Sequence, residues 1–108
     1  MEMRLRERGL DGFDTVYLKG DCDLYSAPRL RNAIVDRIVR GTRKLRIDLS
    51  EVYYLDSTGV GAIIQILRAM KSVQGTLTFR GIRGAPKRVL EMSNVISLLR
   101  IDSGEEIR

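Results

Sequence analysis

The stretch Leu55-Asp56-Ser57-Thr58-Gly59-Val60-Gly61 decides the fold, because a strand pattern ends there and a long helical pattern begins. Before it, Leu45, Ile47 and Leu49 alternate with charged residues, which predicts a strand. After it, apolar residues recur at helical spacing. They are Val60, Ile63, Ile64, Leu67 and Met70, widened by Ala62, Ile66 and Ala69. The stretch therefore joins a strand to what we expect to be the best-buried helix.

The hydroxyl of Ser57 is the candidate functional group of this stretch, and its surroundings allow two interpretations. As a helix N-cap, its hydroxyl would accept a hydrogen bond from a backbone N–H of the first turn. As a phosphorylation site, it would carry negative charge at a helix N-terminus, where free N–H groups and the macrodipole favour an anion. The local sequence by itself favours the cap.

The neighbours of Ser57 also carry alternatives. Asp56 either caps the helix or orients the Ser57 hydroxyl, and Thr58 is a second candidate phosphoacceptor that we expect instead to bond to the backbone. Gly59 and Gly61 are poor helix formers, at about 1 kcal/mol each relative to Ala. Their missing side chains fit the close approach of another protein's backbone, and fit close packing on the sheet equally well.

The other patterns before this stretch predict a hairpin and a helix. The hairpin covers about residues 1–20, because apolar and charged residues alternate on both sides of a turn at 9–12. The helix begins near Ser26, a candidate N-cap, and Gly41 is placed to end it. Asp21 and Asp23 end the second strand, and a parallel arrangement would place them at the same sheet edge as Ser57.

The patterns after the stretch complete a β-β-α-β-α-β-α order. A strand is expected at 76–80, a short helix around 87–92, and a last helical turn or short strand at 96–101; the tail, about 102–108, is expected to be frayed. Two strand-helix-strand passages imply parallel strands with right-handed crossovers. We therefore expect a single α/β domain over residues 1–108, with a mixed four- to five-stranded sheet covered by helices.

The composition argues against several classes of protein. The chain has 108 residues, 44% of them hydrophobic, which is enough for one core. No apolar run approaches the roughly 20 residues that span a bilayer, and no signal region follows the charged start, so we expect a soluble cytoplasmic protein. Without histidine, the commonest general base and metal ligand is missing. Cys22, the only cysteine, lies between two aspartates that disfavour its thiolate.

Acidic and basic residues each suggest a ligand. Asp21, Asp23 and Asp56 are three carboxylates of the kind that binds a divalent cation, but no catalytic base or phosphate-binding glycine loop accompanies them, so we expect no metal and no cofactor. The net charge of +5 and the basic run 29–46 suggest nucleic acid. However, aromatic residues make up only 6% of the chain and no DNA- or RNA-binding signature is present. A solvated helix face or an acidic protein partner explains the charge better.

Three segments together resemble the STAS domain and, within it, the bacterial anti-sigma-factor antagonists. They are residues 18–30, 47–61 and 81–90, which occur in the order of the family across nearly the whole chain. The most specific feature is Asp-Ser-x-Gly directly after a strand, at Asp56 to Gly59.

The resemblance implies partner switching. In that family the serine matching Ser57 is phosphorylated by a cognate anti-sigma factor that is itself an ATP-dependent serine kinase, and the phosphate abolishes binding. A dedicated serine phosphatase restores binding, and the anti-sigma factor then releases its sigma factor to transcription. The family also uses the loop that contains Asp23 in its partner-facing surface. The chain would thus be a substrate and a ligand, not an enzyme.

Three other functions remain as alternatives. Some STAS domains act as docking modules in stress-signalling or transport complexes without a phosphorylation switch. A small nucleotide-binding enzyme would need a phosphate cradle, and Gly59-Val60-Gly61 falls short of one because Ile64 stands where a third glycine is required. Nucleic-acid binding through residues 29–46 is the third alternative.

Overall fold

The order of elements in a computed structural model of the chain, which describes residues 1–102, is the one expected from the sequence. The elements are β1 (Glu2–Arg6), β2 (Asp14–Cys22), α1 (Ala27–Val39), β3 (Lys44–Leu55), α2 (Ser57–Ser72), β4 (Thr76–Arg80), α3 (Gly84–Met92) and a 3-10 turn at Ile96–Leu98. Most of the tail that we expected to be frayed lies outside the described residues. Within residues 1–102, no helix is long and apolar enough to cross a membrane.

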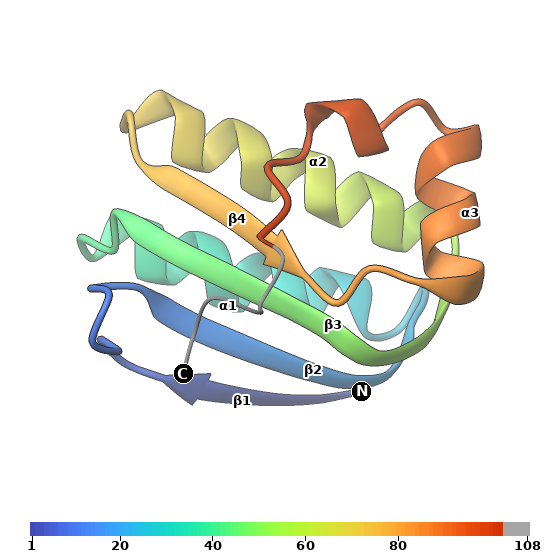
Figure 1. Cartoon of the computed structure of the whole chain (residues 1–108), viewed down its shortest axis with the longest axis horizontal. Helices are drawn as coiled ribbons and strands as arrows, with labels where there is room; N and C mark the ends of the chain where they lie inside the picture. The colour runs from blue at the N-terminus through green and yellow to red at the C-terminus, as the bar shows by residue number, and fades with distance from the viewer. Residues whose placement is uncertain (103–108) are drawn as a thin grey trace.

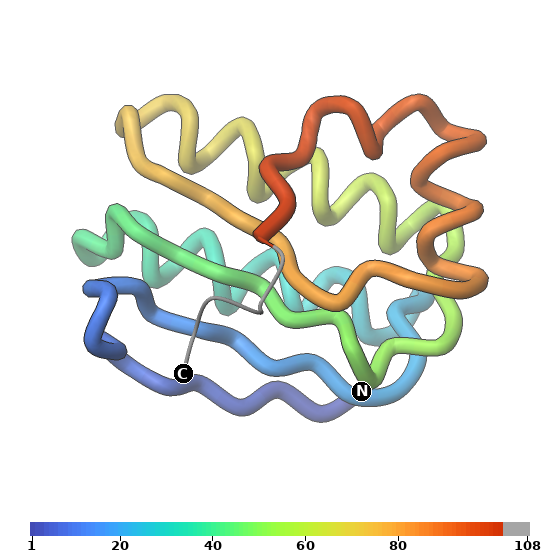
Figure 2. The backbone as a smooth tube through the Cα atoms, in the orientation of Figure 1, coloured from blue at the N-terminus to red at the C-terminus, as the bar shows by residue number. Residues whose placement is uncertain are grey.

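The four strands form one mixed sheet in the order β1-β2-β3-β4 (Figure 1). β1 is antiparallel to β2, whereas β3 is parallel to both β2 and β4, which confirms the two expected crossover passages. The segment after the 3-10 turn runs beside β4, where Ile101 makes a single parallel bridge to Phe79 (Figure 2). Among the described residues, β1 is therefore the open edge of the sheet.

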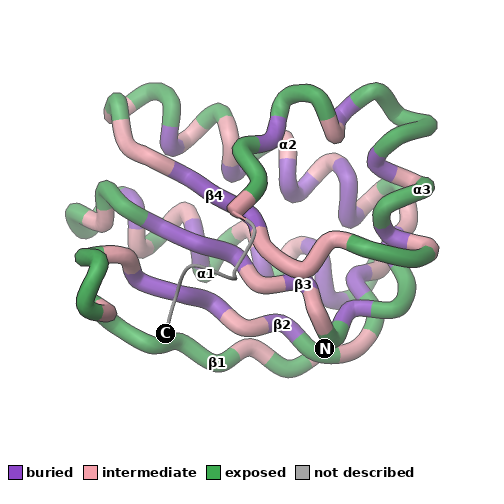
Figure 3. Tube along the Cα trace, in the orientation of Figure 1, coloured by how far each residue is buried: buried purple, intermediate pink, exposed green. Residues whose placement is uncertain are grey.

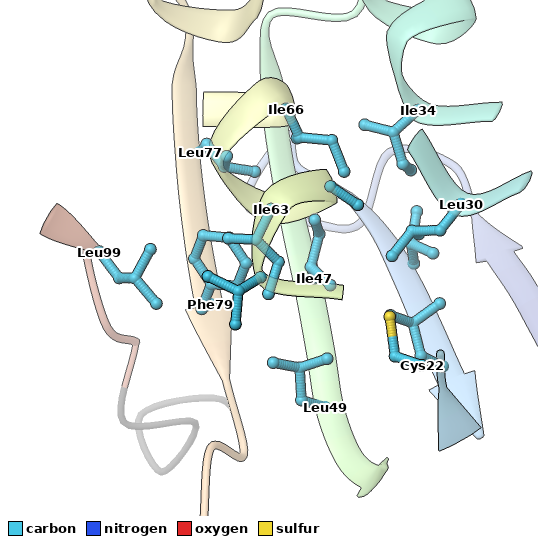
Figure 4. Close-up of a cluster of buried hydrophobic side chains, with 14 of the residues drawn as sticks. Cys22, Leu30, Ile34, Ile47, Leu49, Ile63, Ile66, Leu77, Phe79 and Leu99 are labelled. Carbon is cyan, nitrogen blue, oxygen red and sulfur yellow. The ribbon is translucent and has the colours of Figure 1, made fainter. Parts of the chain in front are cut away.

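The core lies between the sheet and the two long helices. Val16, Ile47 and Phe79 occupy matching positions on β2, β3 and β4, and each is at most 3% exposed. Ile63 and Ile66 pack onto them from α2, and Leu30 and Ile34 from α1 (Figure 4). The predicted apolar stripe of α2 is thus confirmed. Figure 3 shows the same division, with buried positions along the strands and inner helix faces and an exposed β1.

β3 is longer than the sequence pattern indicated. The alternation suggested a strand around 45–49 followed by a connecting segment, but β3 runs for 12 residues to Leu55. Its second half continues to pair with β2 up to Cys22↔Leu55, after β4 has ended opposite Asp48. α3 packs against β3, and it lies at the end of the sheet where β3 continues beyond β4 (Figure 1). Consequently Leu55 ends the strand and, one residue later, α2 begins.

One buried cation holds the outer face of the sheet together. The side chain of Arg46 is 8% exposed; its NH2 lies 2.6 Å from Asp11 Oδ2 and its Nε 2.8 Å from Asp102 Oδ2. The guanidinium carbon also lies 4.8 Å from the centre of the Phe13 ring. Because Asp11 is in the β1–β2 connection and Asp102 follows the 3-10 turn, Arg46 fastens two distant segments onto β3.

Replacing Arg46 should reveal this role. We expect Arg46→Ala to lower the free energy of unfolding by about 2–3 kcal/mol in this partly desolvated site, because Asp11 loses its ion pair and Asp102 loses its 2.8 Å contact while retaining Arg80 at 3.4 Å. The control is Arg40→Ala, whose ion pair with Asp36 is exposed on α1 and should contribute less than about 1 kcal/mol. Urea denaturation of both variants measures the difference, and equal losses would refute the proposed role of Arg46.

Candidate functional site

The carboxyl ends of β2 and β3 meet at one edge of the sheet, as expected from their parallel arrangement. Cys22 and Leu55 are register partners, and the backbone N–H of Asp56 donates to the carbonyl oxygen of Cys22 at 3.3 Å. The segment from Asp21 to Asp23 therefore lies beside the start of α2, at the right-hand end of the sheet in Figure 1. This placement brings Asp21, Asp23 and Ser57 to the same sheet edge.

Asp56, not Ser57, caps α2. Asp56 has extended backbone angles (φ −106°, ψ −173°), and its Oδ1 accepts the N–H of Gly59 at 3.0 Å. Ser57 is the first residue of the helix and is exposed. Its hydroxyl forms no hydrogen bond with any described residue. The prediction that Ser57 caps the helix is therefore wrong, and the capping interpretation of Asp56 is confirmed.

Packing explains one glycine of the stretch but not the other. A Cβ on Gly59 would lie 2.8 Å from the carbonyl oxygen of Cys22 and 3.0 Å from its sulfur. Gly59 is thus required by close packing of α2 on the end of β2. A Cβ on Gly61 would meet nothing within 4 Å, so the packing of the domain does not require a glycine there.

A shallow groove between α1 and α2 lies beside Ser57. Its volume is about 200 Å³. Its lining consists of Ala27, Pro28, Arg31, Thr58, Gly61, Ala62 and Gln65. Thr58 is half-buried there, and its hydroxyl makes no hydrogen bond with a described residue, so the expectation that it bonds to the backbone is wrong. Thr58 and Gly61 instead form part of an open surface next to Ser57.

Asp23 closes the loop between β2 and α1. Its Oδ1 accepts the backbone N–H groups of Tyr25 and Ser26, each at 3.0 Å. These bonds, chiefly that from Ser26, hold the pKa of the Asp23 carboxyl below its usual value. Ser26 precedes α1 but makes no capping bond; its hydroxyl donates to the carbonyl oxygen of Asp21 at 2.7 Å. Ser26 is thus the N-cap residue of α1, as predicted, but the expected side-chain capping bond is absent because the loop uses the hydroxyl.

The same edge exposes large apolar side chains that the sequence reasoning did not single out. Leu24 is 61% exposed, Tyr25 82% and Tyr54 49%, and Tyr54 is the register partner of the exposed Asp21. Such side chains are normally buried, and exposed ones grouped beside polar groups are typical of protein-binding surfaces. We call Asp21, Leu24, Tyr25, Tyr54 and Ser57 the Ser57 surface. In the sequence, Leu24 and Tyr25 fall between the expected end of the strand at Asp23 and the expected start of the helix near Ser26. This position outside both elements is the only sequence signal for their exposure.

The chemistry available at this edge is limited. Cys22 is 1% exposed, and burial, followed by the charges of Asp56 and Asp23, raises the pKa of its thiol to about 11. The thiol is thus protonated at neutral pH. Among residues 1–102 no three acidic, histidine or cysteine side chains are grouped so that they might hold a metal ion. Asp21, Asp23 and Asp56 therefore do not form the cation site considered above.

The fold and the site define a small α/β domain that presents a serine hydroxyl at one sheet edge. The chain belongs to the STAS domain family, whose model matches residues 6–106. The anti-sigma-B factor antagonist of Listeria monocytogenes serovar 1/2a is 30% identical to it over 105 residues, which cover 97% of this chain and 91% of that protein. The antagonist of the same name from Staphylococcus aureus (strain NCTC 8325 / PS 47) is 27% identical, with 99% of each chain covered.

Solved structures share this fold. The anti-sigma factor antagonist SpoIIAA in its unphosphorylated form superposes with a TM-score of 0.80 at 18% identity, covering 97% of this chain and 91% of that one. The phosphorylated form of SpoIIAA, described as a Bacillus cell fate determinant, gives a TM-score of 0.74 at 19% identity, with 97% and 95% covered. At these identities the likeness concerns the fold alone, and it confirms the expected STAS architecture.

The two glycines provide a matched test of the packing at this edge. We expect Gly59→Ala to destabilise the domain by about 1–3 kcal/mol, because its methyl group overlaps Cys22. Gly61→Ala should be neutral or stabilise it by up to about 1 kcal/mol, because alanine favours the helix and has free space. Thermal and urea unfolding measure both, and a destabilisation by Gly61→Ala as large as that by Gly59→Ala would contradict the assignment.

Cys22 should react slowly in the folded chain. Its pKa rises from an ordinary 9.0 to about 11, so its thiolate fraction near pH 8 falls by about 100-fold. We expect iodoacetamide to alkylate the native chain at least that much more slowly than the urea-unfolded chain.

The same shift fixes a pH dependence. The raised pKa means that the folded state favours the protonated thiol of Cys22. The contribution of this thiol to the stability of the fold is therefore complete below pH 9.0 and is lost as the pH rises towards about 11. Cys22→Ala should lack this part of the alkaline destabilisation in urea melts.

In the alkylation experiment, reaction of the native chain at the rate of the unfolded chain would show that Cys22 is not buried.

Proposed function

We propose that this chain is an anti-sigma-factor antagonist that binds a cognate anti-sigma factor while Ser57 is unphosphorylated and loses that binding when Ser57 is phosphorylated. One observation carries the proposal. The Ser57 hydroxyl is exposed and has no hydrogen-bond partner among residues 1–102, at the first position of a helix whose cap is already supplied by Asp56. The relatives named anti-sigma-B factor antagonists, which match nearly the whole chain, support the class of partner.

The partner in this proposal is an anti-sigma factor with serine kinase activity, and a cognate serine phosphatase reverses the modification. The chain itself is a ligand and a substrate. Its exposed hydroxyl suits it to enter another protein's active site, and the raised pKa of Cys22 makes that thiol a poor nucleophile. Release of the sigma factor to transcription follows from occupation of the anti-sigma factor.

A phosphate on Ser57 fits the domain without disturbing it. Within residues 1–102, the backbone N–H groups of Ser57 and Thr58 have no hydrogen-bond partner, and together with the macrodipole they favour an anion. This compensation is worth about 0.3–1 kcal/mol. Because Asp56 already holds the turn, phosphorylation removes no hydrogen bond from the helix.

Repulsion at the partner interface outweighs this small gain. A phosphate dianion about 6 Å from a single partner carboxylate is disfavoured by about 1 kcal/mol in water and about 5 kcal/mol at an effective dielectric of 20. Each 1.4 kcal/mol is about tenfold in affinity. One acidic side chain of the partner that faces the Ser57 hydroxyl is therefore enough to convert tight binding into none that is measurable.

The other residues of the Ser57 surface provide apolar and charged contacts for the partner. Tyr25, Leu24 and Tyr54 supply exposed apolar area around the hydroxyl, and tyrosine is enriched in interface hot spots. Asp21 adds negative charge to the same edge, while Thr58 and Gly61 extend the surface into the groove between α1 and α2. In this proposal Asp23, Asp56 and Gly59 support the site from within, since each maintains the backbone that presents it.

The switch is tested by substitutions at Ser57. Co-purified anti-sigma kinase and ATP should add one phosphate, which mass spectrometry should map to Ser57. Ser57→Ala should bind the anti-sigma factor constitutively. Ser57→Glu, which carries one negative charge instead of two, should reduce the affinity by up to about 100-fold through the repulsion described above. Calorimetry or surface plasmon resonance with the purified partner measures these affinities.

The matched control is Ser72→Glu, which adds the same charge at the other end of α2 and should leave the affinity within about twofold. Phosphate confined to Thr58 or another residue would contradict the proposal. Equal binding by the wild-type chain, Ser57→Ala and Ser57→Glu would instead identify a docking module without a switch.

A further inference from the structure

A second charged feature lies at the end of the sheet opposite Ser57. There the β1–β2 connection, the end of α1 and the start of β3 line an open cleft of about 950 Å³. These three segments lie together at the left-hand end in Figure 1. Five cationic side chains line it: Arg8, Arg37, Arg40, Arg43 and Lys44. We call these residues the basic cleft. Only two carboxylates, Glu7 and Asp14, lie on its walls.

The two carboxylates are already engaged. Glu7 Oε2 lies 2.7 Å from Arg37 NH2, and Asp14 Oδ2 lies 3.7 Å from the same group. Asp14 Oδ1 accepts the backbone N–H of Arg8 at 2.9 Å, and its Oδ2 accepts the Thr42 hydroxyl at 3.3 Å. These contacts fix the wall of the cleft and neutralise Arg37.

The remaining cations exceed what the domain itself can pair. Arg40 forms an exposed ion pair with Asp36. Arg8, Arg43 and Lys44 form no ion pair with any residue in the described part of the chain. Arg43 donates through NH1 to the carbonyl oxygens of Ile38 and Thr42, so the end of α1 accounts for it. Lys44 Nζ lies 5.7 Å from the centre of the Phe13 ring, a contact that leaves its charge without an acidic partner. The Arg8 side chain forms no hydrogen bond or ion pair with a residue in the range 1–102.

The fold, rather than the basic run in the sequence, concentrates this charge. Residues 29–46 do not form one patch, because Arg46 is buried with Asp11 and Asp102 on the outer face of the sheet. Arg29 is at the opposite end of α1 from Arg37 and Arg40. Arg8, which lies outside the run, takes its place in the cleft. Two segments far apart in the sequence therefore create the excess positive charge.

We propose that the basic cleft binds an acidic peptide segment of a protein partner. Guanidinium groups bind carboxylates through paired, charge-assisted hydrogen bonds, and arginine clusters recognise acidic motifs in this way. None of the residues that line the cleft is aromatic, so a nucleobase finds no stacking surface.

The position of the cleft has a functional consequence. It lies at the amino ends of β2 and β3, whereas Ser57 follows their carboxyl ends. A partner in the cleft therefore leaves the Ser57 surface free, and the domain can bind two proteins at once. This second site does not depend on phosphorylation of Ser57.

The test uses the full chain and a fluorescein-labelled octaglutamate peptide as the probe, followed by fluorescence anisotropy. We expect saturable binding that weakens as salt rises. The double variant Arg8→Glu/Lys44→Glu should bind at least tenfold more weakly. The control Arg29→Glu/Lys87→Glu makes the same change in net charge at exposed residues outside the cleft and should bind within about twofold of wild type. Ser57→Glu should bind as wild type does.

Amide chemical shifts of the wild-type chain locate the site without any variant. Octaglutamate should shift the signals of Gly12 and Gly41, which line the cleft, and leave those of Gly59 and Gly61 in place. Equal weakening by both double variants, or shifts spread over the whole basic surface, would overturn the proposal. Tighter binding of tripolyphosphate or of an eight-nucleotide single-stranded DNA at the same amides would also overturn it, in favour of a phosphate ligand.

Discussion

The close contact between Cys22 and the first turn of α2 is the constraint on which the functional edge depends. The carbonyl of Cys22 receives the N–H of Asp56, and the Cys22 residue fills the space that a side chain at position 59 would need. Together with the Cys22↔Leu55 register, this contact locks the ends of β2 and β3 to the start of the helix. Ser57 is thereby held at the surface on a turn that does not use its hydroxyl.

The residues around Ser57 divide into those that build the edge and those that face outwards. One carboxylate oxygen of Asp56 accepts the backbone N–H of Gly59, and one of Asp23 accepts the backbone N–H groups of Tyr25 and Ser26. The side chains of Ser57, Tyr25 and Tyr54 remain exposed. Since no backbone group of the described residues bonds to the serine hydroxyl, a change of charge on Ser57 acts on the protein that docks there rather than on the fold.

Much of this arrangement follows from the sequence, because periodicity and parallel topology are encoded locally. The sequence alone predicted the apolar stripe of α2 and the placement of Asp21, Asp23 and Ser57 at one edge of the sheet. The identity of the cap did not follow, since aspartate and serine are both good caps and only the extended backbone of Asp56 decides between them. The different surroundings of Gly59 and Gly61 depend on neighbours distant in the sequence, and so does the placement of Arg8 and Lys44 in the same cleft.

The central claim is that modification of Ser57 changes a surface and leaves the domain unchanged. Amide hydrogen exchange of the chain carrying phosphoserine at position 57, compared with the unmodified chain, tests it most directly. The account predicts altered exchange only within residues 21–26 and 54–61, with unchanged protection of core amides such as Ile47, Ile66 and Phe79. Loss of protection along α2 or across β3 and β4 would contradict it, because the phosphate would then act by loosening the fold.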